Sequence, residues 1–166
     1  MPRVISYTDP APIVTKQLGR EPRKPWRVLQ NCKYGFPQVI ASPSKLECGE
    51  LFPTWAWLTC PWLAKLASTE ESEGACAQWS EKLRNQPKMS ARLLDVDAEL
   101  RRQRAEEGGG RDLCGEVGIA GNASPLHIKC LHAHIALRLI GLNDPIGKEF
   151  FLRHPRTCAD RRCGKF

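Results

Sequence analysis

The clearest hydrophobic pattern in the chain runs through residues 124–140. Four apolar residues recur there at steps of three and four positions, namely Ile128, Leu131, Ile135 and Leu139. At about 100° per residue they fall within roughly one 80° sector, which is the stripe that an amphipathic helix buries. The pattern therefore predicts a helix in this stretch with one face in the core.

A second helical pattern covers residues 70–107, which are rich in charged side chains and are interrupted by Pro87. Beyond this proline, apolar residues alternate steps of four and three, as on the buried face of a helix: Met89, Leu93, Val96 and Leu100. The pattern predicts two helices, of which the second ends at the glycines that follow residue 107. Residues 108–124 show no period and predict a flexible loop, and residues 148–153 predict a last helical turn.

Short alternating runs in the first part of the chain predict strands at residues 26–31, 38–41 and 54–58. The first two form a hairpin with Cys32 at its tip. The third ends before Cys60, where Pro61 suits the first turn of a following helix. We therefore expect an α+β fold, in which a small antiparallel sheet of about three strands packs against three or four helices.

The length of 166 residues is typical of a single domain. Residues 1–15 contain Pro2, Pro10 and Pro12 and predict an extended N-terminal lead-in. The domain then covers residues 16–153, and residues 154–166 form a basic C-terminal tail.

The net charge of +7 is concentrated at the two ends of the chain. Residues 1–30 and residues 148–166 each carry six basic and two acidic side chains, so each end has a charge of +4 and the body is close to neutral. Basic ends of this kind predict contact with a polyanion or nucleic acid. They lack the interleaved aromatic residues of a base-stacking surface, which favours the alternative of solvated ends that aid solubility.

Hydropathy gives no sign of a membrane protein. No stretch approaches the roughly 18 apolar residues of a membrane span, and the chain begins without an apolar segment. We expect a soluble, cytoplasmic protein. In that compartment the eight cysteines are expected to be thiols or metal ligands rather than disulfides.

Reactive side chains lie beside the apolar stripe of the predicted helix at residues 124–140. His127, Cys130 and His134 share a neighbouring sector, from which polar groups can converge on a cleft. His132 points more than about 90° away if the whole stretch is helical. Cys130 and His132 can converge only if residues 129–132 are extended and the helix begins later.

Cys60 is a separate candidate, because it precedes the helix that Pro61 begins. The dipole and the free N–H groups of a helix N-terminus favour a thiolate and lower its pKa. Cys60 is therefore the best single candidate for a reactive or metal-bound sulfur. The alternative is a small buried cysteine beneath the neighbouring tryptophans.

Four motifs along the chain carry a family resemblance. They are Gln17-Leu-Gly-Arg20, the turn at residues 32–37, Phe52-Pro-Thr54 leading to Trp57-Leu-Thr-Cys-Pro61, and Ile128-Lys-Cys-Leu-His-Ala133 followed by residues 143–147. Together they resemble the motifs of an uncharacterised bacterial family, domain of unknown function 501, over residues 17–151. Members of that family are often encoded near a septum-formation protein and an exopolyphosphatase, which implies a link to cell division or polyphosphate metabolism.

The resemblance picks out Cys32, Cys60, Cys130 and His132 as motif positions. Because thiolate and imidazole are the usual ligands of zinc, we expect these residues to form a tetrahedral Cys3His site. His134 is the alternative imidazole ligand. The chain has no C-x-x-C pair, so only the fold can bring these ligands together.

His127 is a further candidate ligand, and two other functions remain open. The first is a thiol-dependent enzyme, with Cys60 or Cys130 as the nucleophile and His132 or His134 as the base. The second is a binding protein for a polyanion or a protein partner, in which the cysteines and histidines are core residues.

Overall fold

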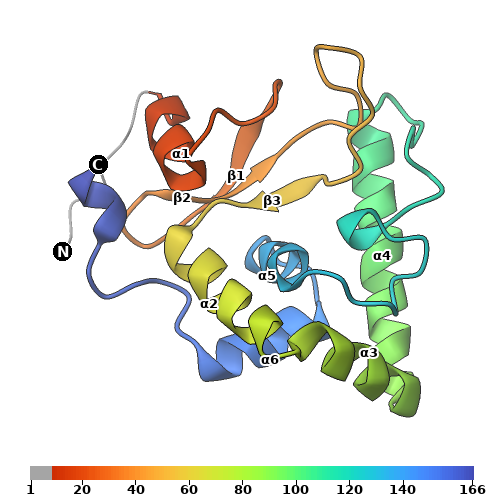
Figure 1. Ribbon diagram of the computed structural model, residues 1–166. Coiled ribbons are helices and arrows are strands. Elements are labelled where there is room, and N and C mark those ends of the chain that lie inside the picture. Colours follow the sequence, from red (N-terminus) through yellow and green to blue (C-terminus); the bar gives the residue numbers. More distant parts are fainter. Residues whose placement is uncertain (1–8) are drawn as a thin grey trace.

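The computed structural model describes residues 9–166 and contains a three-stranded antiparallel sheet and six α-helices (Figure 1). The strands are β1 (Arg27–Asn31), β2 (Pro37–Ala41) and β3 (Ala56–Leu58). The helices are α1 (Ala11–Leu18), α2 (Pro61–Ser72), α3 (Ala75–Asn85), α4 (Pro87–Glu107), α5 (Leu131–Leu139) and α6 (Pro145–Arg153), with short 3-10 helices η1 (Ile119–Gly121) and η2 (Arg162–Lys165). This arrangement confirms the predicted α+β class.

β2 is the central strand of the sheet, whose order is β1-β2-β3. All five of its residues are buried, whereas none of the residues of β1 is. The predicted hairpin is present, and its turn is closed by bonds between the N–H of Cys32 and the carbonyl of Phe36 (2.8 Å) and between the N–H of Gly35 and the carbonyl of Cys32 (2.9 Å). The hairpin therefore holds Cys32 at a fixed place beside β2.

Helix α5 lies at the centre of the molecule, where it contacts β2, β3, α2 and α6 (Figure 1). Its apolar stripe is buried as the periodicity predicted, with Leu131 at 1% and Ile135 at 0% exposure. Fully burying each such side chain contributes about 1.5–3 kcal/mol. Its first residues lie against the end of α2, where the N–H of Leu131 donates to Glu71.

Helix α4 carries the predicted stripe, but its buried face also includes Asp97 and Arg104. The Arg104 guanidinium donates to Asp112 (2.7 Å) and to the carbonyl of Val117 (2.5 Å), and Asp97 accepts from the N–H of Ile119 (2.9 Å). These bonds hold residues 108–124 against α4. Apart from η1 the stretch is the loop that was predicted, but hydropathy alone did not reveal the buried arginine that bonds to its carbonyls.

Helix α1 begins at Ala11, inside the stretch predicted to be an extended lead-in. Pro12 does not break the helix, because it occupies the first turn, where a missing N–H is tolerated. Asp9 accepts from the N–H of Ala11 (2.9 Å), and Gly19 ends the helix at φ 71°. Residues 1–8 of the predicted lead-in lie outside the described residues.

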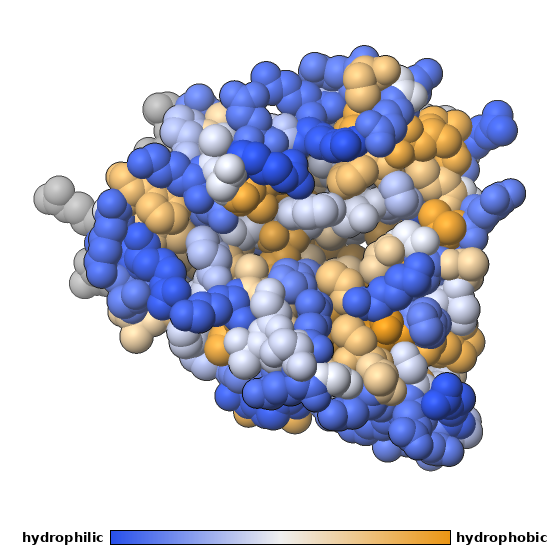
Figure 2. All heavy atoms as spheres, viewed as in Figure 1, coloured by the Kyte–Doolittle hydropathy of each residue, from blue (hydrophilic) through white to orange (hydrophobic). Residues whose placement is uncertain are grey.

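Hydrophilic side chains dominate the rim of the face shown in Figure 2, and hydrophobic ones gather toward the centre and upper right of the view. Leu51 and Leu113 are among the exposed large hydrophobic residues. Within residues 9–166, none of the helices is long and apolar enough to cross a membrane.

Candidate metal centre

The start of α5 differs from the sequence prediction. Cys130 is extended (φ −154°, ψ 123°), and the helix begins at Leu131 rather than near residue 124. The preceding backbone bonds to other elements: the N–H of Ile128 donates to the Ser80 hydroxyl (2.9 Å), and the N–H of Leu131 donates to Glu71 Oε1 (2.6 Å). These bonds replace the helical bonds that periodicity predicted. They produce the late helix start that brings Cys130 and His132 together.

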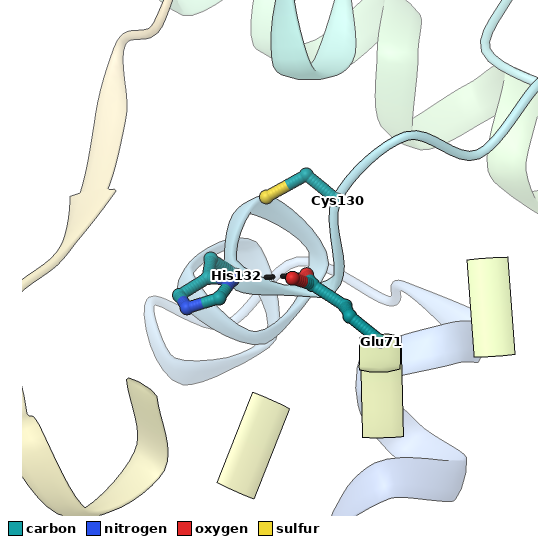
Figure 3. A group of neighbouring side chains, drawn as sticks. All are labelled: Glu71, Cys130 and His132. Atoms are coloured by element: carbon teal, nitrogen blue, oxygen red, sulfur yellow. Dashed lines mark hydrogen bonds and ion pairs between the residues drawn. The ribbon is translucent and has the colours of Figure 1, made fainter. Parts of the chain in front are cut away.

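Glu71, Cys130 and His132 form one group of potential metal ligands. The donor atoms that they offer all lie within 4.8 Å of one another, and no second group of three or more meets this distance among residues 9–166. Glu71 reaches in from the last turn of α2, while Cys130 and His132 come from the start of α5 (Figure 3). All three residues are half-buried, so solvent can reach the group.

The His132 ring is held at both nitrogens. Nδ1 lies 2.9 Å from Glu71 Oε1, and Nε2 lies 3.4 Å from the Ser68 hydroxyl. Hydrogen bonding with Cys130, followed by hydrogen bonding with Glu71, raises the pKa of His132 from 6.5 to about 9, although burial acts in the opposite direction. At neutral pH the imidazole of His132 is therefore protonated.

The spacing of the group is compatible with a bound zinc ion. Zn–N and Zn–O bonds of about 2.1 Å at the tetrahedral angle place the two ligand atoms about 3.4 Å apart. His132 Nδ1 and Glu71 Oε1 are 2.9 Å apart, so an ion requires them to separate by only a few tenths of an ångström. Ser68 would then bond to the second ring nitrogen, as the outer partners of zinc-bound histidines commonly do.

Glu71 also has a purely structural role. Its Oε1 accepts the Leu131 N–H and so caps α5, whose N-cap residue Cys130 makes no side-chain cap bond. A carboxylate can cap a helix and pair with a histidine, as Glu71 does with Leu131 and His132, in a protein that binds no metal. Only the nearby Cys130 thiol distinguishes this group from an ordinary helix cap.

His134 has a different partner from the one that helical geometry suggested. Its Nδ1 lies 2.7 Å from Asp144 Oδ2, and the two side chains are 2% and 0% exposed. Asp144 Oδ1 also accepts the N–H groups of Ile146 and Gly147 (both 2.9 Å), so it caps α6. His134 thus connects α5 to α6. It is not one of the residues that converge with Cys130.

The structure places Cys32 and Cys60 away from Cys130. Cys60 is the N-cap residue of α2, whereas Glu71 lies near the other end, about 16 Å along the helix axis at 1.5 Å per residue. Cys32 and Cys60 both line a cavity beneath the β1–β2 turn. The expected Cys3His ligands therefore lie at two separate places.

Cys60 shows how two influences on a thiol oppose each other. Burial raises its pKa to about 11, even though the N–H groups of Leu63 and Trp62 at the start of α2 act to lower it. Desolvation is the larger effect here. As a free thiol Cys60 is therefore not an activated nucleophile at neutral pH.

His127 is exposed, and its backbone carbonyl accepts from the Asn122 side chain (2.7 Å).

Sequence reasoning did not identify Glu71 or Ser68, the partners that α2 supplies. These two residues are three apart and so share a helix face, but a charged and polar stretch of this kind reads as solvated surface. Only the contact between α2 and α5 reveals their role.

Comparison with protein families gives one result. The model of the family described as "Protein of unknown function (DUF501)" matches residues 28–151 of the 166-residue chain. Comparison with curated proteins and with solved structures finds no significant match. The matched region contains Glu71, Cys130 and His132, and it ends before the C-terminal tail.

Proposed function

The chain belongs to the DUF501 family, as its motifs predicted, and we propose that it binds a zinc ion through Glu71, Cys130 and His132. Carboxylate, thiolate and imidazole are all zinc ligands. The observation that carries the proposal is the convergence of the three donor atoms within 4.8 Å from two helices that are distant in sequence. Cys130 and His132 are among the expected ligands, and Glu71 joins them in place of the two further cysteines that were expected, Cys32 and Cys60.

Three protein ligands leave one tetrahedral position for a water molecule or a substrate. Catalytic zinc sites keep such an open position, whereas structural sites have four protein ligands. The half-buried group is accessible to solvent, which suits the open type. A bound zinc ion lowers the pKa of its water, so the reaction class that this site supports best is metal-assisted hydrolysis. The polyphosphate link that the family resemblance implied makes a phosphoanhydride the first substrate class to assay.

Elemental analysis and zinc titration of matched variants test the proposal. We expect Glu71→Gln, Cys130→Ser and His132→Asn each to lose one bound zinc ion, or to weaken it at least tenfold, relative to the unmodified chain. Glu73→Gln is the control, because Glu73 is an exposed glutamate two positions away on the same helix end. If the three variants bind zinc with unchanged stoichiometry and affinity, the ion is held elsewhere and the proposal fails.

A thiol-dependent enzyme is the second candidate, and one observation favours it. Cys130 is the first cause that raises the pKa of His132 to about 9, and a protonated imidazole beside a cysteine is the arrangement that activates a thiol nucleophile. Alkylation at pH 6 distinguishes the two functions, with the exposed Cys48 as the internal control. Cys130 labelled faster than Cys48 without a chelator indicates a nucleophile, and fast labelling only after chelation indicates a metal ligand.

A further inference from the structure

The C-terminal tail, residues 154–166, reaches the core through its cysteines: Cys163 packs with Ile13 and Phe36, and Cys32 and Tyr34 lie against this cluster. Cys158 and Cys163 are its only buried residues, at 8% and 7% exposure. Apart from η2 the tail has no helix or strand, yet it turns back to lie beside α1 and the β1–β2 hairpin (Figure 1). Ordering such a segment costs conformational entropy that buried apolar area usually offsets. Here two cysteines make the buried contacts of the tail, and Cys163 makes them with Ile13 and Phe36.

The two tail thiols face two others. Cys32, Cys60, Cys158 and Cys163 all line one cavity, which lies between the β1–β2 turn, the start of α2 and the tail. The four cysteines come from three segments that only the fold brings together. In contrast to the Glu71 group, this cavity has no carboxylate or imidazole in its lining, so its donor set consists of sulfur.

The surroundings of the four thiols suit thiolates that bind a cation. Gln17 donates through Nε2 to Cys163 Sγ (3.4 Å), and the N–H groups of Leu63 and Trp62 act on the Cys60 sulfur. N–H groups directed at sulfur are the outer contacts that hold metal-bound thiolates in place. Arg161 and Arg162 also line the cavity, and since Arg162 pairs with Asp160 (3.1 Å), Arg161 is the positive charge that offsets part of the net −2 charge of four thiolates around a divalent ion.

The thiols also influence one another electrostatically. Burial raises the pKa of Cys163, and the nearby charges of Cys158 and Cys32 raise it further. Cys60 is likewise affected by Cys163 and Cys158. Three of the four cysteines are buried and Cys32 is half-buried, so thiolates around this cavity would repel one another unless a cation lay between them.

We propose that Cys32, Cys60, Cys158 and Cys163 form a second metal site, in which four thiolates bind one zinc ion and fasten the tail to the hairpin and to α2. The reaction is an ion exchange: the four thiols release four protons and form four Zn–S bonds, with no redox change. Tetrahedral coordination by four cysteines with no open position is typical of a structural zinc site.

Zinc binding requires the four sulfurs to move closer together. Sulfurs on one zinc ion are about 3.8 Å apart, given Zn–S bonds of about 2.3 Å. No three of these four sulfurs, all within the described part of the chain, lie within 4.8 Å of one another. The tail can follow the ion, because Cys158 and Cys163 lie in irregular chain and in a single 3-10 turn rather than in a long helix.

The site lies outside the Glu71 group and does not depend on it. Cys158 and Cys163 also follow residue 151, where the family match ends, so the site uses residues that the family region does not contain. A test must therefore remove the Glu71 group first. The double variant Cys130→Ser/His132→Asn serves as the background protein.

Elemental analysis, cobalt substitution and X-ray absorption test the second site. The full-length background protein, purified with a thiol reductant, is expected to hold one zinc ion with four sulfur neighbours at about 2.3 Å. Its cobalt form should show strong sulfur-to-cobalt charge-transfer absorption. Adding Cys158→Ser and Cys163→Ser should abolish both signals, whereas adding Cys48→Ser should leave them unchanged.

Limited trypsin digestion gives a readout that does not need a tail variant. Chelation of the background protein should release the tail and expose cleavage after Arg156 and Arg161, and added zinc should restore protection. The proposal is overturned if the folded background protein binds no zinc, or if fewer than four sulfurs surround the ion. It is also overturned if the tail is protected equally with and without a chelator, or only by a disulfide that a reductant cleaves.

Discussion

The two ends of helix α2 hold two cysteine environments of opposite character. At its N-terminal end, Cys60 lies in a buried cavity with three other thiols. At its C-terminal end, Glu71 joins Cys130 and His132 in a half-buried group of mixed oxygen, sulfur and nitrogen donors. The two ends of one helix therefore border a cavity lined by four cysteines and a half-buried group of mixed donors, about 16 Å apart along its axis.

The difference shows that position at a helix end does not by itself activate a thiol. Cys60 has the N-terminal position that lowers a thiol pKa, yet burial raises its pKa to about 11. Cys130 also precedes a helix, α5, but the first N–H group of that helix, from Leu131, donates to Glu71. The imidazole of His132 lies beside Cys130. The immediate partners and the degree of burial, rather than the position at a helix end, set the chemical environment of each thiol.

The largest expected difference between the two ends of α2 is in the free energy of unfolding that a cysteine substitution removes. We expect Cys163→Ser to lower the free energy of unfolding by about 3–5 kcal/mol, on the scale of losing a structural metal or another core interaction. Cys130→Ser should cost about 1 kcal/mol or less, because its side chain is half-buried and an open site adds little to the fold. Urea unfolding of the zinc-loaded proteins measures both values. Equal losses for the two variants would remove the distinction between a closed and an open site.

The two histidines of α5 provide the second test. His134→Ala should cost about 3 kcal/mol, since it leaves the buried Asp144 carboxylate without its partner. Zinc affinity of the Glu71 group, measured on the folded variant, should not change. His132→Ala should show the reverse, with a small loss of stability and a large loss of zinc. A zinc loss in the folded His134→Ala chain would make His134 a ligand after all.

The sequence predicted the elements well because periodicity reports which face of an element is buried. The apolar stripe of α5, the hairpin and the Pro61 helix start all depend on local patterns of this kind. The start of α5 was misplaced because the bonds from Ile128 to Ser80 and from Leu131 to Glu71 are tertiary contacts that no periodicity contains.

The site was harder to predict than the fold for the same reason. Cys130 and His132 stood out as reactive residue types within a motif, but Glu71 is one of several glutamates in a charged stretch. Cys158 and Cys163 have four residues between them and no nearby partner in the sequence. Their possible partners, Cys32 and Cys60, lie about a hundred residues earlier, so only the folded chain places them in one cavity.

The pH dependence of zinc binding tests the open group. The metal-free His132 has a pKa of about 9, above its usual 6.5, so contacts of the protonated ring stabilise the metal-free fold fully below about pH 6.5 and are lost as the pH rises through 9. Zinc competes with this proton. Its apparent affinity should therefore rise at least about tenfold per pH unit between pH 6.5 and 8.5.

Calorimetry in buffers of different ionisation enthalpy measures the protons that zinc releases. His132→Asn in a chain that retains the four tail and core thiols is the matched control, because it removes only the open site. Zinc binding to the Glu71 group with no proton release near pH 7 would contradict the assigned protonation state of His132.

The smallest expected effect concerns the basic ends of the chain. The C-terminal end also contains Cys158 and Cys163, which complicates a test by deletion. Deleting residues 154–166 would remove two proposed ligands as well as charge, so substitution of exposed lysines is the cleaner change. Asp160, which pairs with Arg162, is already counted in the charge of +4, but Arg153 also pairs with Glu70, which lies outside residues 148–166. Only part of the +4 charge is therefore available to a polyanion.

If the C-terminal end binds RNA or polyphosphate, Lys148→Gln and Lys165→Gln should each reduce the salt dependence of binding by about one counterion between 50 and 200 mM salt. Both lysines are exposed. Lys88→Gln is the control, because Lys88 is an exposed lysine in the near-neutral body. Equal effects at all three positions would mean that the charge acts diffusely. Unchanged binding in every variant would show that these lysines take no part in binding and would leave the ends as solvated segments.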